Sequence, residues 1–218
     1  MKRERDEKKR VLLNYWRSSC SWRVRIALAF KDLDYEYKAV NLLKGEDCDP
    51  EYAKLNPAGV PTLVDEDGTT ITQSWAILEY LEERYPAKPL LPRAFDERAH
   101  ARSIALLIVS GVQPLHNLAM LQRVEKLTDK ATKEQYAKDV LNDSLWGVEE
   151  LLKKHSGKFC VGDTFTLADV CIPPCVYGAV RFGADMSRFP TLMKINETLS
   201  KLDFVDRCKP ENMPDAVK

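Results

Sequence analysis

The sequence predicts a two-part chain, in which a small mixed α/β domain is followed by an all-α helical bundle. Three observations lead to this division. Short strand-like apolar runs alternate with helical stretches over residues 11–86. The segment 87–94, AKPLLPRA, is rich in proline and typical of a linker. From Phe95 onward strand signals nearly vanish, and the apolar residues follow a helical period.

The first domain opens with a strand, a helix and a second strand. Residues 11–15, VLLNY, form an apolar run typical of a short buried strand. Ser18–Ser21, SSCS, predicts a turn and a helix cap, and residues 22–31 carry the apolar positions of a helix. Residues 35–40 predict a second strand, followed by a polar loop over 41–49. Because a strand, a helix and a strand follow one another, we expect a parallel pair.

A second helix, a hairpin and a third helix complete this domain. Pro50 favours the start of a short helix. Pro61 stands directly before a strand, where a missing N–H donor is tolerated. Asp67-Gly68 is typical of a hairpin turn. The elements predicted here are a helix over 50–55, strands over 62–65 and 69–72, and a helix over 74–85. The order is therefore β-α-β-α-β-β-α.

The second domain is predicted to be helical throughout. Pro114 should kink or break its first helix, and Pro173-Pro174 should bend its third. Helices are predicted over residues 95–126, 131–155, 166–180 and 190–202. The resulting domain limits are 1–10 for a disordered tail, 11–86 for the α/β domain, 87–94 for the linker and 95–218 for the helical domain.

Composition excludes several classes of protein. The chain has 218 residues, enough for a sizeable core without disulfides or a structural metal. Its 33 basic and 33 acidic side chains cancel, whereas nucleic-acid binding requires a basic surface. The longest apolar run, residues 104–109, is far shorter than the roughly 18 residues of a membrane span. We expect neither nucleic acid nor a membrane as a partner.

The cysteines and histidines show no metal or disulfide pattern. The six cysteines form no C-x-x-C pair, and the three histidines lie far apart, so no metal site is predicted. The N-terminal segment 1–10, MKRERDEKKR, lacks the apolar region of a secretory signal. We therefore expect a cytoplasmic protein with reduced thiols.

One motif is interpreted as purely structural. Thr166-Leu-Ala-Asp169 is the pattern of a capping box, with Asp in place of the usual Glu or Gln. The threonine side chain would accept from a backbone amide near Asp169, and the carboxylate would accept from the Thr166 amide. We assign it no catalytic role.

Three other motifs have a structural and a functional interpretation. Ser18–Ser21 precedes a helix, where free amides and the helix dipole favour a thiolate, or it is a cap with an incidental cysteine. Gln73-Ser74 either caps the next helix through Ser74 or forms an anion site for a ligand carboxylate. A cis Val60-Pro61 bond would turn the Val60 backbone toward an extended peptide, although cis is the minority form.

Together these pieces resemble the cytosolic glutathione transferases. The likeness covers residues 11–213 and rests on the β-α-β-α-β-β-α half, Val60-Pro61, Gln73-Ser74, the linker and the Thr-x-x-Asp box. The run 18–28, SSCSWRVRIAL, is similar to the signature of the zeta class, as is 111–117, GVQPLHN. The resemblance implies a thioredoxin-like N-terminal domain followed by an all-α bundle, the glutathione transferase fold.

The resemblance also implies roles for individual residues. Ser18 would activate the glutathione thiol, with Ser19 and Cys20 completing the catalytic site. The Val60 backbone would pair with the cysteinyl unit of glutathione. The other candidate glutathione-binding residues are Ser21, Gln73, Ser74, Gln113 and Asn117, the last two near the second substrate. Arg181 is the candidate clamp for the carboxylate of the substrate.

The implied activity is the glutathione-dependent cis–trans isomerisation of maleylacetoacetate to fumarylacetoacetate, a step of tyrosine and phenylalanine breakdown. Transferase activity on small α-halo acids would accompany it. Glutathione would be the cofactor, and the family implies a homodimer. Two alternatives remain open at this point. One is a glutathione-dependent thiol transferase in which Cys20 attacks a disulfide; the other is a non-catalytic binding protein that has kept the fold.

Two loops and one residue depart from the family pattern. In the segment 56–61, Asn56-Pro57 and Val60-Pro61 are separated by one residue fewer than is usual in the family. The loop 43–49 is shorter than usual, which leaves its glutathione contact open, with Lys44 as the candidate. Trp75 replaces a smaller aliphatic residue beside Ser74, and its role is also open.

Overall fold

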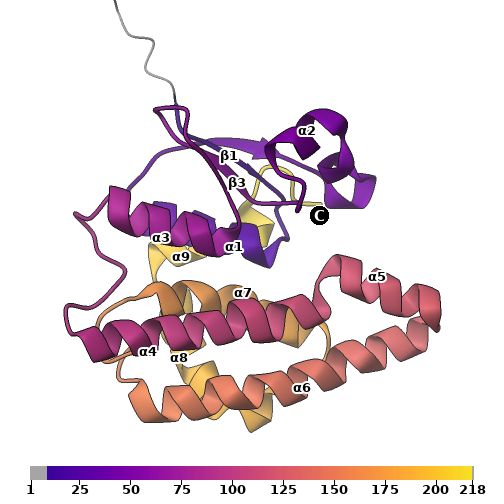
Figure 1. The fold of residues 1–218 in the computed structure, drawn as a ribbon. Coiled ribbons are helices and arrows are strands. Elements are labelled where there is room, and N and C mark those ends of the chain that lie inside the picture. The colour runs from indigo at the N-terminus through magenta and orange to yellow at the C-terminus, as the bar shows by residue number, and fades with distance from the viewer. Residues whose placement is uncertain (1–8, 218) are drawn as a thin grey trace, which may run out of the picture. The chain divides into compact units, whose positions relative to one another are not determined.

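The computed structural model describes residues 9–217, which form two compact units. The first unit comprises residues 9–88 and 207–217, and the second comprises residues 89–206. Residues 207–217 are predicted to belong to the helical domain, whereas the structure groups them with the first unit. The predicted fold class, a small mixed sheet with helices followed by a helical bundle, is confirmed (Figure 1).

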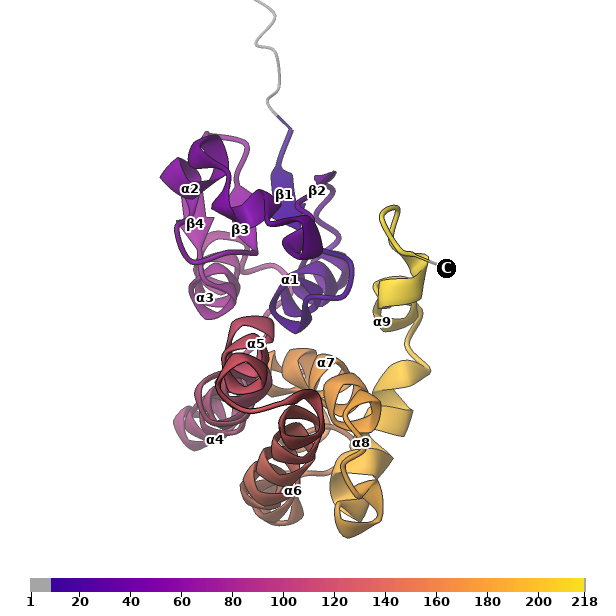
Figure 2. The same ribbon diagram turned by 90° about the vertical axis from the view of Figure 1, so that its right-hand side faces the viewer.

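The first unit is built on a four-stranded sheet in the order β2-β1-β3-β4 (Figure 2). Its strands are β1 (Val11–Asn14), β2 (Glu36–Ala39), β3 (Thr62–Val64) and β4 (Thr70–Thr72). Leu12 lies opposite Tyr37 in the parallel pair of β1 with β2 and opposite Leu63 in the antiparallel pair with β3. The predicted parallel pair and the predicted hairpin of β3 with β4 are both confirmed.

Three helices belong to this sheet. They are α1 (Ser19–Phe30), α2 (Pro50–Leu55) and α3 (Ser74–Arg84). Figure 2 shows α1 and α3 side by side on one side of the sheet and α2 on the other. Both helices carry fully buried apolar side chains, among them Val24 and Ile26 of α1 and Ile77 and Leu81 of α3. The loop predicted over 41–49 contains two short 3-10 turns.

Arg10 is part of the folded unit although it falls in the predicted disordered tail. Its side chain is 2% exposed. The guanidinium donates to the Asp65 carboxylate at 2.8 Å, to the Tyr85 hydroxyl at 2.8 Å and to the Asp34 carbonyl at 2.9 Å. The predicted tail therefore ends before Arg10; residues 1–8 lie outside the described residues.

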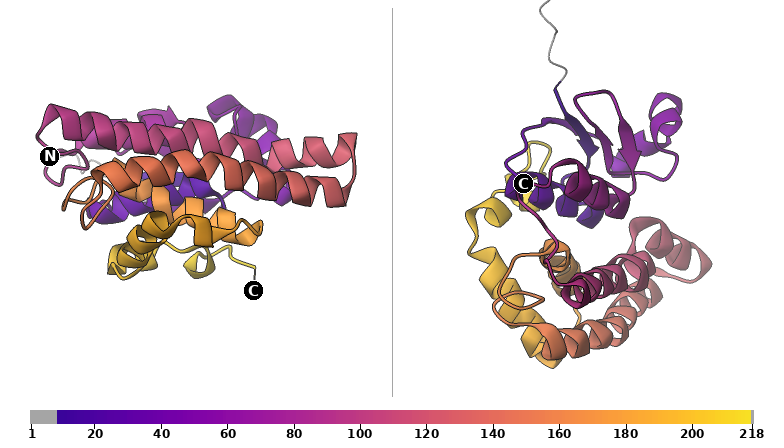
Figure 3. Two further views of the ribbon diagram at one scale, coloured as in Figure 1. Left: turned by 90° about the horizontal axis from the view of Figure 1, so that it is seen from below. Right: turned by 60° about the vertical axis from the view of Figure 1, so that its left-hand side comes forward.

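The second unit is a helical bundle. It contains α4 (Phe95–Leu106), α5 (Leu118–Leu127), α6 (Lys130–His155), α7 (Leu167–Arg181), α8 (Pro190–Ser200) and the short α9 (Asp203–Asp206). Its long helices α4, α6 and α7 lie side by side with similar axis directions (Figures 1 and 3). Between α4 and α5 run a π-helical turn (Leu107–Val112) and a 3-10 turn (Gln113–His116), so the predicted break at Pro114 is confirmed. The helix α7 is continuous through Pro173-Pro174.

The stretch Phe95–Leu127 corrects one expectation. It contains an 18-residue window of mean hydropathy 1.6, apolar enough by length and composition to cross a membrane. This window contains polar residues between its apolar ones, so it is longer than the unbroken apolar run at 104–109. The signal is weak, since a core helix of a soluble protein passes the same test, and Ile104, Ile108 and Val112 are fully buried.

Candidate active site

Three predicted motifs of the first unit meet at one end of its sheet. The strand register places Leu13 opposite Thr62, and Thr62 opposite Thr72. The turn after β1, the residues before β3 and the residues after β4 therefore leave the sheet at the same end. These segments carry Ser18–Ser21, Val60-Pro61 and Gln73-Ser74.

Ser18 caps α1, as the sequence predicts. Its hydroxyl oxygen accepts from the Ser21 amide at 3.2 Å, and its own amide donates to the Tyr15 carbonyl at 3.0 Å. The first turn of α1 carries no acidic residue. The positive end of this helix is thus not neutralised by its own sequence, which favours an anion such as a thiolate beside Ser18.

The four residues of the Ser18–Ser21 turn differ in accessibility. Ser18, Ser19 and Cys20 are half-buried, whereas Ser21 is fully buried. The Ser21 hydroxyl has no hydrogen-bond partner among the described residues. Ser21, predicted to bind glutathione, is therefore closed to a ligand here, because the helix turns its side chain inward. The other three remain available.

The Val60-Pro61 bond is cis. The loop around it is held from both sides: the Tyr52 hydroxyl donates to the Gly59 carbonyl at 2.8 Å, and the Asn56 amide donates to the Pro61 carbonyl at 3.1 Å. No hydrogen bond among the described residues uses the amide or carbonyl of Val60, which is half-buried. These two groups are free to pair with an extended peptide.

Gln73 and Ser74 differ from the expected cap. Gln73 is the N-cap of α3 and has a φ of 68°, in the left-handed region that non-glycine residues rarely adopt. Ser74 is the first residue of the helix rather than its cap, so that interpretation was wrong. The Ser74 side chain is 5% exposed, and its hydroxyl accepts from Arg23 at 3.4 Å. Strained backbone of this kind often marks a ligand site.

Arg23 is a residue that sequence reasoning missed. Its side chain is 1% exposed, and its Nη1 lies 3.4 Å from the Ser74 hydroxyl and 3.8 Å from the Cys20 sulfur. Its Nε and Nη2 atoms have no hydrogen-bond partner among the described residues. A buried positive charge therefore links the two helix N-termini. The available signal was the spacing from Cys20 to Arg23, which places both on one face of α1.

The first unit thus offers complementary groups to a small peptide with a thiol and a carboxylate. The N-terminus of α1 and Ser18 suit a thiolate. Val60 suits an extended backbone, and Ser74 with Arg23 suits a carboxylate. This donor set fits glutathione.

The predicted site residues of the second unit gather around His116. Gln113 opens the 3-10 turn that ends at His116. Asn117 caps α5, its side-chain oxygen accepting from the Met120 amide at 2.8 Å. The His116 ring meets the Phe182 ring edge-on at 5.8 Å. Arg181, exposed at the end of α7, has its guanidinium 5.0 Å from the centre of the Phe182 ring.

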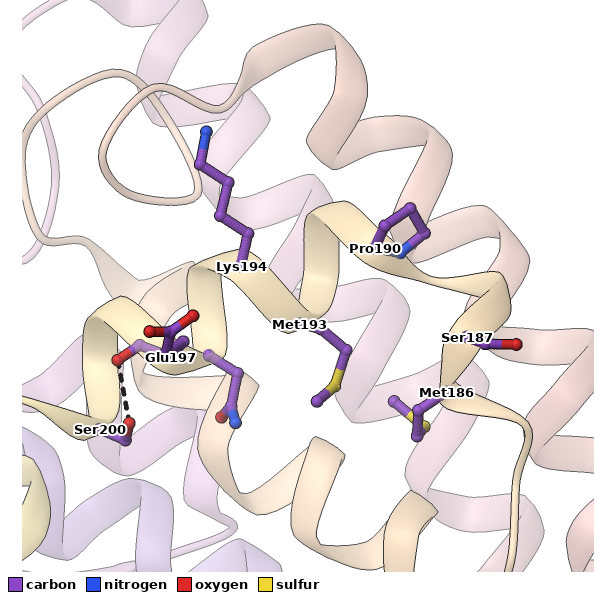
Figure 4. A pocket seen from close by; sticks show the side chains of 8 residues that line it. Met186, Ser187, Pro190, Met193, Lys194, Glu197 and Ser200 are labelled. Carbon is purple, nitrogen blue, oxygen red and sulfur yellow. Dashed lines mark hydrogen bonds between the residues drawn. The ribbon is translucent and has the colours of Figure 1, made fainter.

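Two further observations concern sites elsewhere. An open pocket on α8 is lined by Met186, Ser187, Pro190, Met193, Lys194, Asn196, Glu197 and Ser200 (Figure 4). None of the predicted site residues lines it.

Within residues 9–217, no group of three or more histidine, cysteine and acidic side chains could hold a metal ion.

Comparisons with known proteins bear out the resemblance. The protein-family model of the glutathione S-transferase N-terminal domain matches residues 17–84. The family model of the C-terminal domain matches residues 115–205. A probable maleylacetoacetate isomerase of Caenorhabditis elegans is 52% identical over 95% of this chain and 96% of its own length.

Solved structures agree. Maleylacetoacetate isomerase from Anaeromyxobacter dehalogenans, with bound GSH in the active site, is 38% identical with a TM-score of 0.88, covering 96% of this chain and 98% of that one. A maleyl pyruvate isomerase described as a bacterial glutathione S-transferase in the zeta class is 34% identical with a TM-score of 0.90, covering 95% and 100%. The chain therefore belongs to the glutathione S-transferase family, in the zeta class with the maleylacetoacetate isomerases.

Proposed function

We propose that this enzyme isomerises maleylacetoacetate to fumarylacetoacetate with glutathione as its cofactor. The observation that carries the proposal is the meeting of Ser18, the Val60 backbone and Ser74 at one end of the sheet. The name and ligand of the similar isomerases support the choice of substrate and cofactor.

Bound glutathione would supply a thiolate that adds to the conjugated double bond, lets the new single bond rotate and then leaves. Ser18 stabilises that thiolate. Because its oxygen already accepts from the Ser21 amide, its hydrogen is free to donate outward. The dipole of α1 adds to this effect and lowers the pKa of a thiol bound there.

The remaining residues orient the reactants. The amide and carbonyl of Val60 fix the cysteinyl unit, while Ser74 and the Arg23 charge hold the γ-glutamyl carboxylate. Arg181 binds the carboxylate of the substrate and stabilises the negative charge that develops on addition. Cys20 supports the thiolate without forming a bond to substrate.

Further properties belong to the same proposal. We expect transferase activity on small α-halo acids, since the same thiolate can displace halide. The reaction places the enzyme in tyrosine and phenylalanine breakdown. We also propose a cytoplasmic homodimer, the commonest assembly of soluble oligomers.

The test combines purified protein with maleylacetoacetate, with and without glutathione. We expect loss of the cis isomer only when glutathione is present, without loss of glutathione. Tight glutathione binding with no conversion would contradict the proposal. A Cys20→Ala variant separates the thiol transferase alternative: isomerisation should survive in part, whereas disulfide exchange by Cys20 would be lost.

A further inference from the structure

The C-terminal segment 207–217 contacts the turn that leads into Ser18. The carboxylate of Asp215 accepts from the backbone amide of Trp16 at 3.2 Å and from the Tyr37 hydroxyl. Asp215 and Trp16 are 199 residues apart in the sequence. Asp215 also lies beyond the range of the family motifs, so nothing in the proposed mechanism uses it.

Arg25 holds the other side of the same turn. Its guanidinium is fully buried and donates to the Trp16 carbonyl at 2.9 Å. It also donates to the Cys208 carbonyl at 3.3 and 3.4 Å. Trp16 therefore has its amide fixed by Asp215 of the C-terminal segment and its carbonyl fixed by Arg25, which also contacts that segment at Cys208.

The position of Ser18 depends on this turn. The Ser18 amide donates to the Tyr15 carbonyl at 3.0 Å, and Arg25 reaches that carbonyl at 3.4 Å. Only Arg17 separates Trp16 from Ser18. A shift of the Trp16 backbone would therefore move the Ser18 hydroxyl and the first amides of α1.

Tyr37 strengthens the hold of Asp215. Burial and the hydrogen bond to Asp215 raise the pKa of Tyr37, so its hydroxyl stays protonated at neutral pH and acts as the donor. The Asp215 carboxylate thus receives two hydrogen bonds, one from β2 and one from the turn after β1. Hydrogen bonds to an ionised acceptor are stronger than neutral ones.

We propose that Asp215 is a positioning residue, which holds the Trp16–Ser18 turn so that the Ser18 hydroxyl and the α1 amides meet the thiol. The inference rests on the proposed role of Ser18. Asp215 itself touches neither cofactor nor substrate. The C-terminal segment is thereby part of the apparatus that sets thiol reactivity.

The test compares Asp215→Asn with Glu211→Gln, an exposed position in the same segment. Asparagine keeps one oxygen acceptor, but its NH2 group faces either the Trp16 amide or the Tyr37 hydroxyl. Because both of these are donors, one hydrogen bond is lost. We measure the pH dependence of kcat/KM and the ultraviolet thiolate absorbance of bound glutathione. For Asp215→Asn we expect the apparent pKa of the bound thiol to rise by about one and kcat/KM at neutral pH to fall about tenfold. Glu211→Gln should change neither.

A second variant covers the case in which Asp215→Asn does not fold. Tyr37→Phe removes one of the two donors and should shift the pH profile in the same direction, by less. Unchanged pH profiles in both variants, even with a lowered melting temperature, would overturn the positioning role. Ser18→Ala is measured alongside. If it leaves the apparent pKa of the bound thiol unchanged, the proposed role of Ser18 is wrong, and this inference is wrong with it. If the apparent pKa of the bound thiol shifts in Ser18→Ala but not in Asp215→Asn or Tyr37→Phe, only the positioning role of Asp215 is overturned.

Discussion

Two helix N-termini of this chain differ in the group that accepts from their free backbone amides. At the start of α7, the Asp169 carboxylate accepts from the amides of Cys160 and Thr166 and from the Thr166 hydroxyl, each at 2.8 Å. At the start of α1, the neutral Ser18 hydroxyl accepts one amide at 3.2 Å. Asp169 is fully buried, whereas Ser18 is half-buried.

The difference separates stability from function. A helix N-terminus leaves unpaired amides and a partial positive charge. In α7 the sequence supplies its own anion and closes the site. In α1 the sequence leaves the place open for an anion from outside, and in the proposed function that anion is the thiolate. Mutations at the two caps should therefore have opposite consequences.

The largest expected effect is on stability at α7. Asp169→Ala leaves two buried amides and a hydroxyl without their acceptor. Each unpaired group costs about 1–3 kcal/mol, so the free energy of unfolding should fall by about 3 kcal/mol or more. Urea unfolding measures it. The control is Asp129→Ala, which removes the exposed cap of α6 and should cost about 1 kcal/mol. Equal losses would contradict the distinction between a buried and an exposed anion.

Ser18→Ala should show the reverse pattern. Removing a hydrogen bond to a developing or stored negative charge lowers kcat by about a hundredfold in comparable sites. The lost cap should cost only about 1 kcal/mol of unfolding free energy. Steady-state kinetics and urea unfolding of the same preparation test both. A variant that unfolds readily yet keeps its activity per folded molecule would reverse our assignment of the two helices.

Arg23 sharpens the comparison, because its charge is buried and no carboxylate among residues 9–217 pairs with it. Arg23→Met keeps the approximate volume but removes the charge, and buried charges replaced in this way often leave stability unchanged or raised. The dissociation constant of glutathione should rise about tenfold, as expected for losing a charged group near an anion. Calorimetry and thermal unfolding measure the two quantities, with Arg23→Lys as the charge-conserving control. Unaltered glutathione affinity in Arg23→Met would show that the charge does not serve the ligand.

The sequence predicts the elements well where periodicity and local motifs decide them. Pro50 begins a helix that spans 50–55 as expected, and the Thr166–Asp169 box forms as expected. The left-handed Gln73 was not predictable, because nothing local distinguishes it from an ordinary helix start.

The buried arginines were missed for a different reason. Arg10, Arg23 and Arg25 resemble surface residues in any hydrophobicity pattern, yet all three are buried. Their partners, such as Asp65 and the carbonyl of Cys208, lie far along the chain. For these pairs of Arg10 and Arg25, sequence spacing carries no information. The grouping of 207–217 with the first unit was missed on the same ground.

The smallest expected effect concerns pH and a histidine pair of the second unit. The rings of His100 in α4 and His155 in α6 stack with centroids 3.7 Å apart. Burial, and then the charges of His100 and Lys154, lower the pKa of His155. The unfolded chain therefore binds protons more readily at this position than the folded chain, so unfolding free energy should decline as the pH falls below about 6.5, the ordinary histidine value. His100→Gln removes the like charge and should flatten this decline, measured by urea unfolding between neutral and mildly acidic pH. An identical slope in wild type and His100→Gln would show that His100 does not affect the protonation of His155. Activity per folded molecule should be the same in both, since neither histidine is among the residues of the proposed active site.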